Sequence, residues 1–282
     1  MPRYGFSIDV TRCTGCYACF LACKDEFAGN DRLPVAAAQT NEGTAWLRIE
    51  ETTHGAGSKV KVDYTTVMCQ HCQDAPCIKP EFGDAVYRRP DGIVIIDPVK
   101  AKGRKEIVDS CPYGVIQWNE SSQLAQKCNL CAQLIDSGEK TTRCVETCPT
   151  QAMVFGDLDD PKSAVSQVLN EKPGKYEDYR PELATRPAVK YFGLPKPFVA
   201  GEVLLADKRG ECAGGAKVTL VSKNGQTVMT TTTDFLGDFE FKGLTAAAEY
   251  TLRAEVEGYR AKEITVRVNT SVNVGEVVLD VR

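Results

Sequence analysis

Twelve of the thirteen cysteines of this chain fall before residue 149, and they come in tight groups. The first group has the spacing CxxCxxCxxxC and consists of Cys13, Cys16, Cys19 and Cys23. Two-residue gaps let three successive thiolates surround one face of a cubane cluster, while the fourth is carried away at the start of a helix. Zinc sites also use CxxC pairs, but a triple at this spacing is far more typical of an iron–sulfur cluster. The pattern therefore predicts a domain built around [4Fe-4S] clusters rather than a disulfide framework.

The other eight clustered cysteines complete this scheme. They are Cys69, Cys72 and Cys77, then Cys111 before Pro112, then Cys128, Cys131, Cys144 and Cys148 before Pro149. Bacterial ferredoxins pair such runs crosswise, because the last cysteine of one run ligates the cluster that the other run holds. This rule predicts three clusters, with ligands Cys13, Cys16, Cys19 and Cys148 for cluster 1, Cys23, Cys128, Cys131 and Cys144 for cluster 2, and Cys69, Cys72, Cys77 and Cys111 for cluster 3. Cys212 has no partner in this arithmetic and is expected to be a free thiol or a small hydrophobe.

The expected fold class is α+β, with three segments of different composition. Residues 1–155 are predicted to form a ferredoxin-like cluster domain that begins with a strand. Residues 156–197 carry six prolines and are expected to be a largely extended connector, with at most a short helix around Ser163 to Glu171. Such a long extended segment usually lies on another surface, so a strap that wraps a partner protein is expected near Pro187 to Phe198. Residues 198–282 are predicted to form an all-β sandwich.

Seven short blocks in the tail alternate apolar and polar residues. They are Val199–Leu205, Ala216–Val221, Thr227–Thr233, Phe239–Phe241, Tyr250–Val256, Glu263–Val268 and Val272–Leu279. This period of two predicts seven antiparallel strands. Asn224-Gly225 between two blocks predicts a type I′ hairpin turn, in which both turn residues have positive φ.

Charge and hydropathy exclude several classes of partner. The 34 basic and 38 acidic residues give a net charge of −4 without long runs of either sign, which argues against nucleic acid and anionic membranes as partners. No apolar stretch approaches the roughly 20 residues of a membrane span. No signal sequence is recognisable before Cys13, so the cytoplasm is the expected compartment, although an exported partner could carry the chain across a membrane.

No sequence motif points to a substrate site in this chain, because nucleophile elbows, Walker loops and dinucleotide-binding loops are absent from the sequence. Catalytic residues are therefore expected on a partner, and this chain is expected to carry electrons. Arg12, Lys127 and Arg143 each directly precede a ligand cysteine. They either raise a cluster's potential or are solvated surface charges. His71 lies between Cys69 and Cys72 and is expected to form hydrogen bonds or pack rather than bind metal.

The cysteine pattern resembles the four-cluster ferredoxin-like subunits of dimethyl-sulfoxide-reductase-class molybdenum and tungsten enzymes. In that pattern a further cysteine would fall at Glu81, and a CxxC run would lie within Asp97 to Ser110, where this chain has none. All ligands of one cluster are thus missing together, which leaves three clusters. The segment DGIVIIDPVKAKGRKEIVDSCPYGVIQWNE and the C-terminal sandwich resemble the small subunits of pyrogallol–phloroglucinol transhydroxylase and its relatives. The run TTTDFLGDFEFKGL resembles carboxypeptidase-regulatory-like and Cna-B immunoglobulin-type domains, and a docking or stabilising role is expected for it.

The resemblance implies a heterodimer in which a large subunit holds molybdenum or tungsten on bis-molybdopterin guanine dinucleotide. The complex would transfer, add or remove a hydroxyl group on a polyphenol ring, and this chain would conduct electrons. The alternative from another class is a free polyferredoxin, which would be monomeric and would need neither strap nor sandwich. A zinc-bound scaffold is a third alternative, and it predicts a colourless protein without iron.

Overall fold

The structure is a computed structural model that describes residues 1–208 and 211–282, and these residues divide into two compact units. The first unit consists of Met1–Glu51 and Asp63–Leu194, and it contains the twelve clustered cysteines. The second unit consists of Thr52–Val62 and Pro195–Arg282. No helix among the described residues is long and apolar enough to cross a lipid bilayer.

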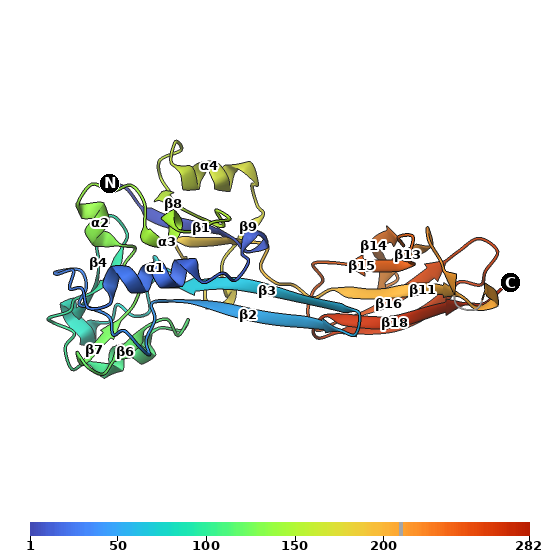
Figure 1. Cartoon of the computed structure of the whole chain (residues 1–282), viewed down its shortest axis with the longest axis horizontal. Coiled ribbons are helices and arrows are strands. Elements are labelled where there is room, and N and C mark those ends of the chain that lie inside the picture. The colour runs from blue at the N-terminus through green and yellow to red at the C-terminus, as the bar shows by residue number, and fades with distance from the viewer. Residues whose placement is uncertain (209–210) are drawn as a thin grey trace. The chain divides into compact units, whose positions relative to one another are not determined.

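A four-stranded sheet forms the centre of the first unit, in the order β8-β1-β10-β9 (Figure 1). Its strands are β1 (Tyr4–Asp9), β8 (Met153–Asp157), β9 (Tyr176–Glu177) and β10 (Val189–Phe192). Strand β1 pairs antiparallel with β8 and parallel with β10. The side chains of Phe6, Ile8 and Tyr191 are fully buried against this sheet, and helix α4 (Ala164–Glu171) packs on β8 and β1. The sheet therefore anchors both ends of the cysteine-bearing region.

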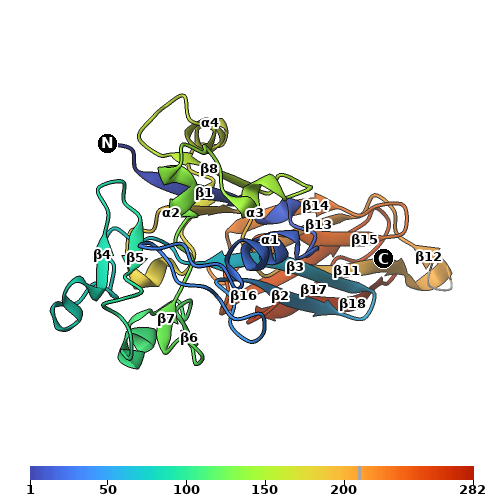
Figure 2. The same cartoon turned by 60° about the vertical axis from the view of Figure 1, so that its left-hand side comes forward.

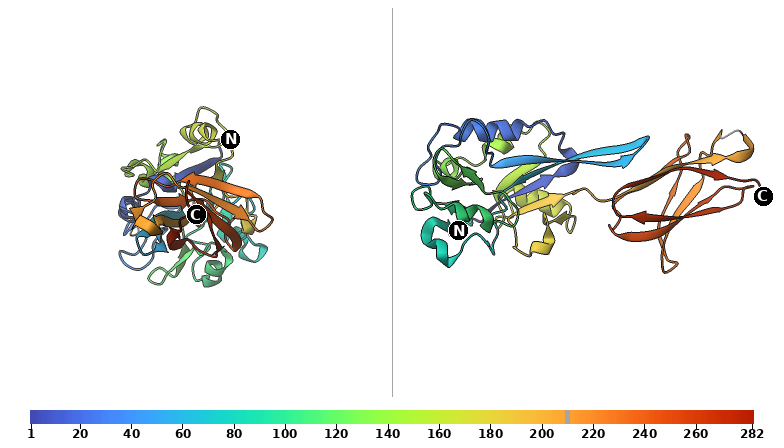
Figure 3. Two further views of the ribbon diagram at one scale, coloured as in Figure 1. Left: turned by 90° about the vertical axis from the view of Figure 1, so that its right-hand side faces the viewer. Right: turned by 90° about the horizontal axis from the view of Figure 1, so that it is seen from below.

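Short helices and hairpins carry the rest of this unit. The α-helices are α1 (Ala18–Phe27), α2 (Ala132–Asp136) and α3 (Arg143–Glu146), and the 3-10 helices are η1 (Val10–Arg12), η2 (Pro80–Ala85), η3 (Lys105–Ser110) and η4 (Pro181–Leu183). The hairpins are β2 (Leu47–Ala56) with β3 (Lys59–Met68), β4 (Val86–Arg88) with β5 (Val94–Ile96), and β6 (Gln117–Asn119) with β7 (Leu124–Gln126). Figure 2 shows the β4–β5 and β6–β7 hairpins together, and the right-hand view of Figure 3 shows β2 and β3 along their length.

The segment expected to be an extended strap is largely part of the first unit. Its short helix is α4, close to the range expected from the sequence. Strand β10 follows Pro187 and hydrogen-bonds to β1, so that Phe6 lies opposite Val189 and Ile8 opposite Tyr191. Because the apolar side chains of Val189 and Tyr191 are buried on this sheet, β10 already has its partner within the chain.

The second unit is a sandwich of two sheets around one apolar core. One sheet contains β12 (Glu211–Cys212), β11 (Val199–Leu205), β15 (Asp238–Phe241) and β18 (Val272–Leu279), and the other contains β14 (Thr227–Thr232), β13 (Lys217–Ser222), β16 (Ala248–Glu255) and β17 (Lys262–Val268). Helix η5 (Ala206–Lys208) follows β11. All seven predicted strands are present within a residue or two of their expected bounds, and β12 is an additional short strand. The expectation of purely antiparallel pairing was wrong, because the last strand, β18, runs parallel to β11.

The turn between β13 and β14 differs from the predicted type I′ hairpin. Gly225 has a φ of 78°, but Asn224 is not among the residues with positive φ. The Gly225 N–H donates to the Ser222 carbonyl oxygen over 2.9 Å, and Ser222 N–H donates to Gln226. The prediction of two left-handed residues was therefore wrong, because the loop is longer than two residues and needs positive φ only at the glycine.

The tip of the β2–β3 hairpin belongs to the sandwich unit. Asn273 donates to the Ala56 carbonyl oxygen over 2.9 Å, His54 Nδ1 lies 2.7 Å from Ser271 Oγ, and Lys59 pairs with Asp238. A side chain at Gly55 would meet the Lys59 carbonyl oxygen at 2.1 Å, so only glycine fits there.

Candidate iron–sulfur centres

The first set of thiols surrounds the start of helix α1. Cys13 and Cys16 precede the helix, Cys19 lies in its first turn, and Cys148 follows α3. Burial and then the thiol of Cys13 raise the pKa of Cys19 to about 11, and Cys148 and Cys16 act in the same direction. These four thiols therefore lie close enough to interact, and the set matches the expected ligands of cluster 1. Cys16 is the exposed member.

Local backbone geometry lets this loop curl around a compact group. Gly15 has a φ of 66°, and a Cβ atom there would lie 2.5 Å from the Tyr64 ring. The next turn uses a left-handed Tyr17, with a φ of 60°. The Ala152 N–H lies 3.3 Å from Cys148 Sγ and donates to it. Amide donors of this kind stabilise a ligating thiolate and tune its electronic properties.

The second set brings together α1, α2 and α3. Burial raises the pKa of Cys23, and the thiols of Cys128 and Cys144 raise it further. Burial also raises the pKa of Cys131, and Cys128 adds to that effect. These four thiols match the expected ligands of cluster 2. Donors approach their sulfur atoms, because the Leu130 N–H lies 3.5 Å from Cys128 Sγ and the Gln39 amide lies 3.8 Å from Cys23 Sγ.

The indole N–H of Trp46 is a suitable hydrogen-bond donor to sulfur in the second set. Trp46 is 3% exposed and packs in an apolar cluster with Cys131, against which Cys23 and Cys128 also pack. Its buried Nε1–H has no hydrogen-bond partner in the part of the chain that the structure describes. Since a buried donor without an acceptor is costly, a cluster held by these cysteines is a suitable partner for it.

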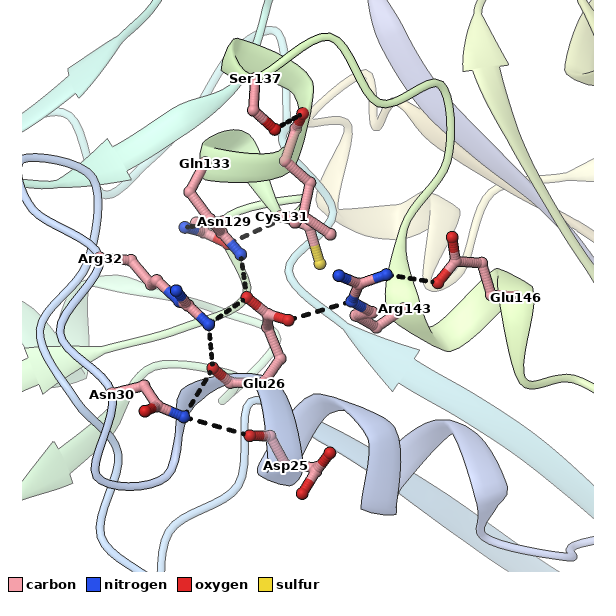
Figure 4. Close-up of polar contacts among 11 residues, drawn as sticks. Asp25, Glu26, Asn30, Arg32, Asn129, Cys131, Gln133, Ser137, Arg143 and Glu146 are labelled. Atoms are coloured by element: carbon pink, nitrogen blue, oxygen red, sulfur yellow. Dashed lines mark hydrogen bonds and ion pairs between the residues drawn. The ribbon is translucent and has the colours of Figure 1, made fainter.

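A charged network joins the helices of the second set (Figure 4). Glu26, which is 8% exposed, pairs with Arg32 over 2.9 Å and with Arg143 over 3.0 Å, and it accepts a hydrogen bond from Gln133 over 3.2 Å. Arg143 also pairs with Glu146 over 2.8 Å. The network holds α1, α2 and α3 around Cys131, and it balances the charge of Arg143 with two carboxylates. The role of Glu26 was not predicted from the sequence, although Glu26 follows Cys23 by three residues and lies on the same helix, α1.

The third set lines one cavity. Cys69, Cys72, Cys77 and Cys111 all contribute to its wall, together with apolar side chains and Lys127. The first three of these thiols are buried. Burial and then Cys69 raise the pKa of Cys77 to about 12, whereas Lys127 lowers it. Four cysteines around one cavity are the number of thiolate ligands that a [4Fe-4S] cluster needs.

His71 braces the loop that carries this set. It is 2% exposed and adopts a left-handed conformation with a φ of 43°. Its Nδ1 accepts the Val94 N–H over 3.0 Å. Burial lowers the pKa of His71, and the charges of Lys127 and Arg88 lower it further, so the ring is neutral. This hydrogen bond agrees with the role expected from the sequence.

The second set lies next to both of the others, because Cys19 shares a buried apolar cluster with Cys144, and Cys128 packs against the cluster that contains Cys69. Cys19 of the first set adds to the raised pKa of Cys144, after burial and the nearer thiols of its own set. Cys69 of the third set likewise adds to the raised pKa of Cys128, after burial. Raised pKa values keep such thiols protonated until a metal displaces the protons. No three His, Cys, Asp or Glu side chains in residues 1–208 and 211–282 are arranged to hold a single ion.

Buried apolar residues lie beside the positions where the four-cluster pattern has further ligands. Glu81 is exposed, but Phe82 is 4% exposed and packs with Ile107 in the core around Cys77. Arg104 lies 5.5 Å from the Phe82 ring centroid and donates to the Phe82 carbonyl oxygen over 2.8 Å.

Two known families match parts of the chain. The 4Fe-4S dicluster domain matches residues 60–158, and the carboxypeptidase regulatory-like domain matches residues 199–280. These matches confirm the predicted combination of a ferredoxin-like domain with an immunoglobulin-like sandwich.

Curated relatives match over most of the chain. The pyrogallol hydroxytransferase small subunit of Pelobacter acidigallici is 38% identical over 99% of this chain and 100% of its own length. The arsenate respiratory reductase iron-sulfur subunit of a Shewanella species is 30% identical over 67% of this chain and 95% of its own length. One of the subunits of the tetrathionate reductase of Salmonella typhimurium is 31% identical over 70% of this chain and 75% of its own length. The chain therefore belongs to the family of iron–sulfur electron-transfer subunits of molybdopterin oxidoreductases, together with the pyrogallol hydroxytransferase small subunit.

Proposed function

We propose that this chain holds three [4Fe-4S] clusters and conducts electrons within a heterodimeric oxidoreductase. Its partner would be a large catalytic subunit with molybdenum or tungsten on bis-molybdopterin guanine dinucleotide. The proposed ligands are the three sets of four cysteines described above. The observation that carries this proposal is the grouping of twelve thiols into three sets of four, with the third set around a single cavity.

The residues of the chain have distinct tasks in this proposal. Bound [4Fe-4S] clusters supply one-electron redox chemistry. The cysteines hold them, the Ala152 and Leu130 amides donate to ligand sulfur atoms, and apolar side chains keep water from the third set. The Glu26 network keeps the helices of the second set in place.

The proposed reaction of the complex is transfer, addition or removal of a hydroxyl group on a polyphenol ring. The support is the 38% identity to the pyrogallol hydroxytransferase small subunit over nearly the full length of both chains. Catalytic residues are proposed to lie on the large subunit, so this chain would be non-catalytic. The sandwich is proposed to be a docking or stabilising module.

Anaerobic purification from the native host tests the proposal. We expect a large subunit to co-purify, with about twelve irons per copy of this chain, four for each cluster, and with molybdenum or tungsten in the complex. A complex without either pterin metal would refute the assignment to this enzyme class. Twelve irons on a lone monomer would instead indicate a free polyferredoxin, and zinc without iron would indicate a scaffold.

A matched pair of cysteine variants tests the ligand sets. We expect Cys111→Ser to lower the iron content by about four atoms per chain, because Cys111 is the distant ligand of one cluster. Cys212→Ser is the control, since this exposed thiol lies outside all three sets. Iron analysis and electron paramagnetic resonance give the readout. Equal iron contents in the two variants would contradict the assignment of Cys111.

A further inference from the structure

One side chain, that of Lys127, reaches from the second set of thiols to the third. Lys127 directly precedes Cys128, and its ammonium donates to the Cys128 carbonyl oxygen over 3.1 Å. The same ammonium donates to the Val94 carbonyl oxygen. Lys127 also lines the cavity surrounded by the four cysteines of the third set. It therefore contacts the backbone of one ligand set and faces the other.

The backbone of Val94 holds the Lys127 ammonium in place and is itself hydrogen-bonded to His71. Its carbonyl oxygen accepts from Lys127, while its N–H donates to Nδ1 of the buried His71 over 3.0 Å. His71 belongs to the loop of the third set, between Cys69 and Cys72. The ammonium is thus held by backbone groups that are themselves tied to the loops of both sets.

The charge of Lys127 lies in a buried environment. The residue is 4% exposed, and no carboxylate within residues 1–208 and 211–282 forms an ion pair with it. A charge acts more strongly at low dielectric than in water, because solvent does not screen it. Its charge is close to both sets, since Lys127 lines the cavity of the third set and its ammonium lies 3.1 Å from the Cys128 carbonyl oxygen.

The other two cations that precede ligand cysteines are placed differently. Arg143 pairs with Glu26 and Glu146, which balance its charge (Figure 4). Arg12 is exposed, so water and salt screen its charge. Of these three cations, Lys127 alone combines burial, lack of a carboxylate partner and contact with two ligand sets.

We propose that Lys127 is a positioning residue that sets the reduction potentials of the second and third clusters together and couples electron transfer between them. Its positive charge favours the more negative, reduced form of either cluster. When one electron moves between the two, one cluster is oxidised and its neighbour is reduced by that electron, and no proton or other atom is transferred. This inference rests on the ligand sets in the proposed function.

A redox titration of the purified complex, followed by electron paramagnetic resonance, tests the role of Lys127. In Lys127→Met we expect reduction of the third cluster to become at least tenfold less favourable, which is about 59 mV for one electron. The second cluster should shift in the same direction, and the first should change less than threefold. Lys127→Arg retains the charge and should keep all three potentials within threefold of the wild type. Arg12→Gln is the matched control and should change none by more than threefold.

Iron content and redox potentials together distinguish failure of the proposed role of Lys127 from absence of the third cluster. If Lys127→Met keeps about twelve irons and titrates like the wild type, the role of Lys127 is refuted. If Lys127→Met loses about four irons while Lys127→Arg keeps them, the charge is needed to hold the third cluster, which supports the proposal. Equal shifts of the potentials in the Met and Arg variants, or loss of about four irons from both, would overturn it. A wild-type complex with only about eight irons would refute the third cluster itself, whatever the variants do.

Discussion

The two units of this chain close their cores in different ways. In the sandwich, seventeen buried residues form one continuous cluster, and none of them is a cysteine. In the cysteine-bearing unit the buried residues form four separate clusters, and each includes at least one proposed ligand, such as Cys19, Cys77, Cys69 or Cys131. The apolar core of that unit is therefore interrupted at the places where its ligands gather.

Because their cores differ, the two units should be stabilised by different interactions. A continuous apolar core stabilises a β-sandwich through burial alone. Small cores divided by metal ligands gain much of their stability when the metal group binds, because binding free energy becomes folding free energy. We therefore expect the sandwich to be independent of iron and the first unit to depend on it.

Removal of iron and sulfide from the full chain with a chelator should change the stability of the first unit more than any single substitution. We expect amide protection against hydrogen exchange to fall throughout the first unit, because each of its buried clusters includes at least one proposed ligand. Protection in β13, β16 and β11 of the sandwich should remain. Hydrogen exchange measured by mass spectrometry gives both values in one experiment. Equal loss of protection in the two units would show that the comparison is wrong.

The second prediction concerns Phe82, which lies next to Glu81, the position where the four-cluster pattern has a further cysteine. Phe82→Ala removes a ring that is 4% exposed and packs beside Cys77, so we expect a cost of about 3–5 kcal/mol in local stability. Exchange in β4 and β5 should become faster, and the third set should lose iron sooner to a chelator. Phe235→Ala, at a residue that is 84% exposed, is the matched control with an expected effect within about 0.5 kcal/mol. Similar iron loss in both variants would mean that Phe82 does not support the third set.

The features that could be predicted from the sequence are those that local spacing determines. The seven strands of the sandwich follow from alternation within blocks of three to eight residues, and the proposed cysteine sets follow from two-residue gaps and the CP motifs. For each distant cysteine the crosswise rule predicts a cluster from the order of the runs along the chain, and this assignment remains a proposal.

Features that depend on distant contacts were not predictable in the same way. The pairing of β10 with β1 joins residues about 180 positions apart, and no local pattern around Val189 indicates it. The position of Lys127 could be noted from its neighbour Cys128, but its reach into the third cavity depends on how Val94 is placed. The turn at Asn224 was mispredicted because a dipeptide pattern does not determine the loop length that the strand register needs.

A substitution in the sandwich core tests whether the stability of the sandwich is independent of the iron content of the first unit. Leu220 is fully buried on β13 and lies opposite Leu252, so Leu220→Ala should cost about 2–5 kcal/mol in the stability of the sandwich. Because the cysteine sets lie in the other unit, the iron content should stay at the wild-type value. Leu236→Ala, at a residue that is 50% exposed, should leave both quantities unchanged. Hydrogen exchange of β13 and β16 combined with iron analysis provides the measurement, and loss of iron from the Leu220 variant would mean that the two units are not stabilised independently.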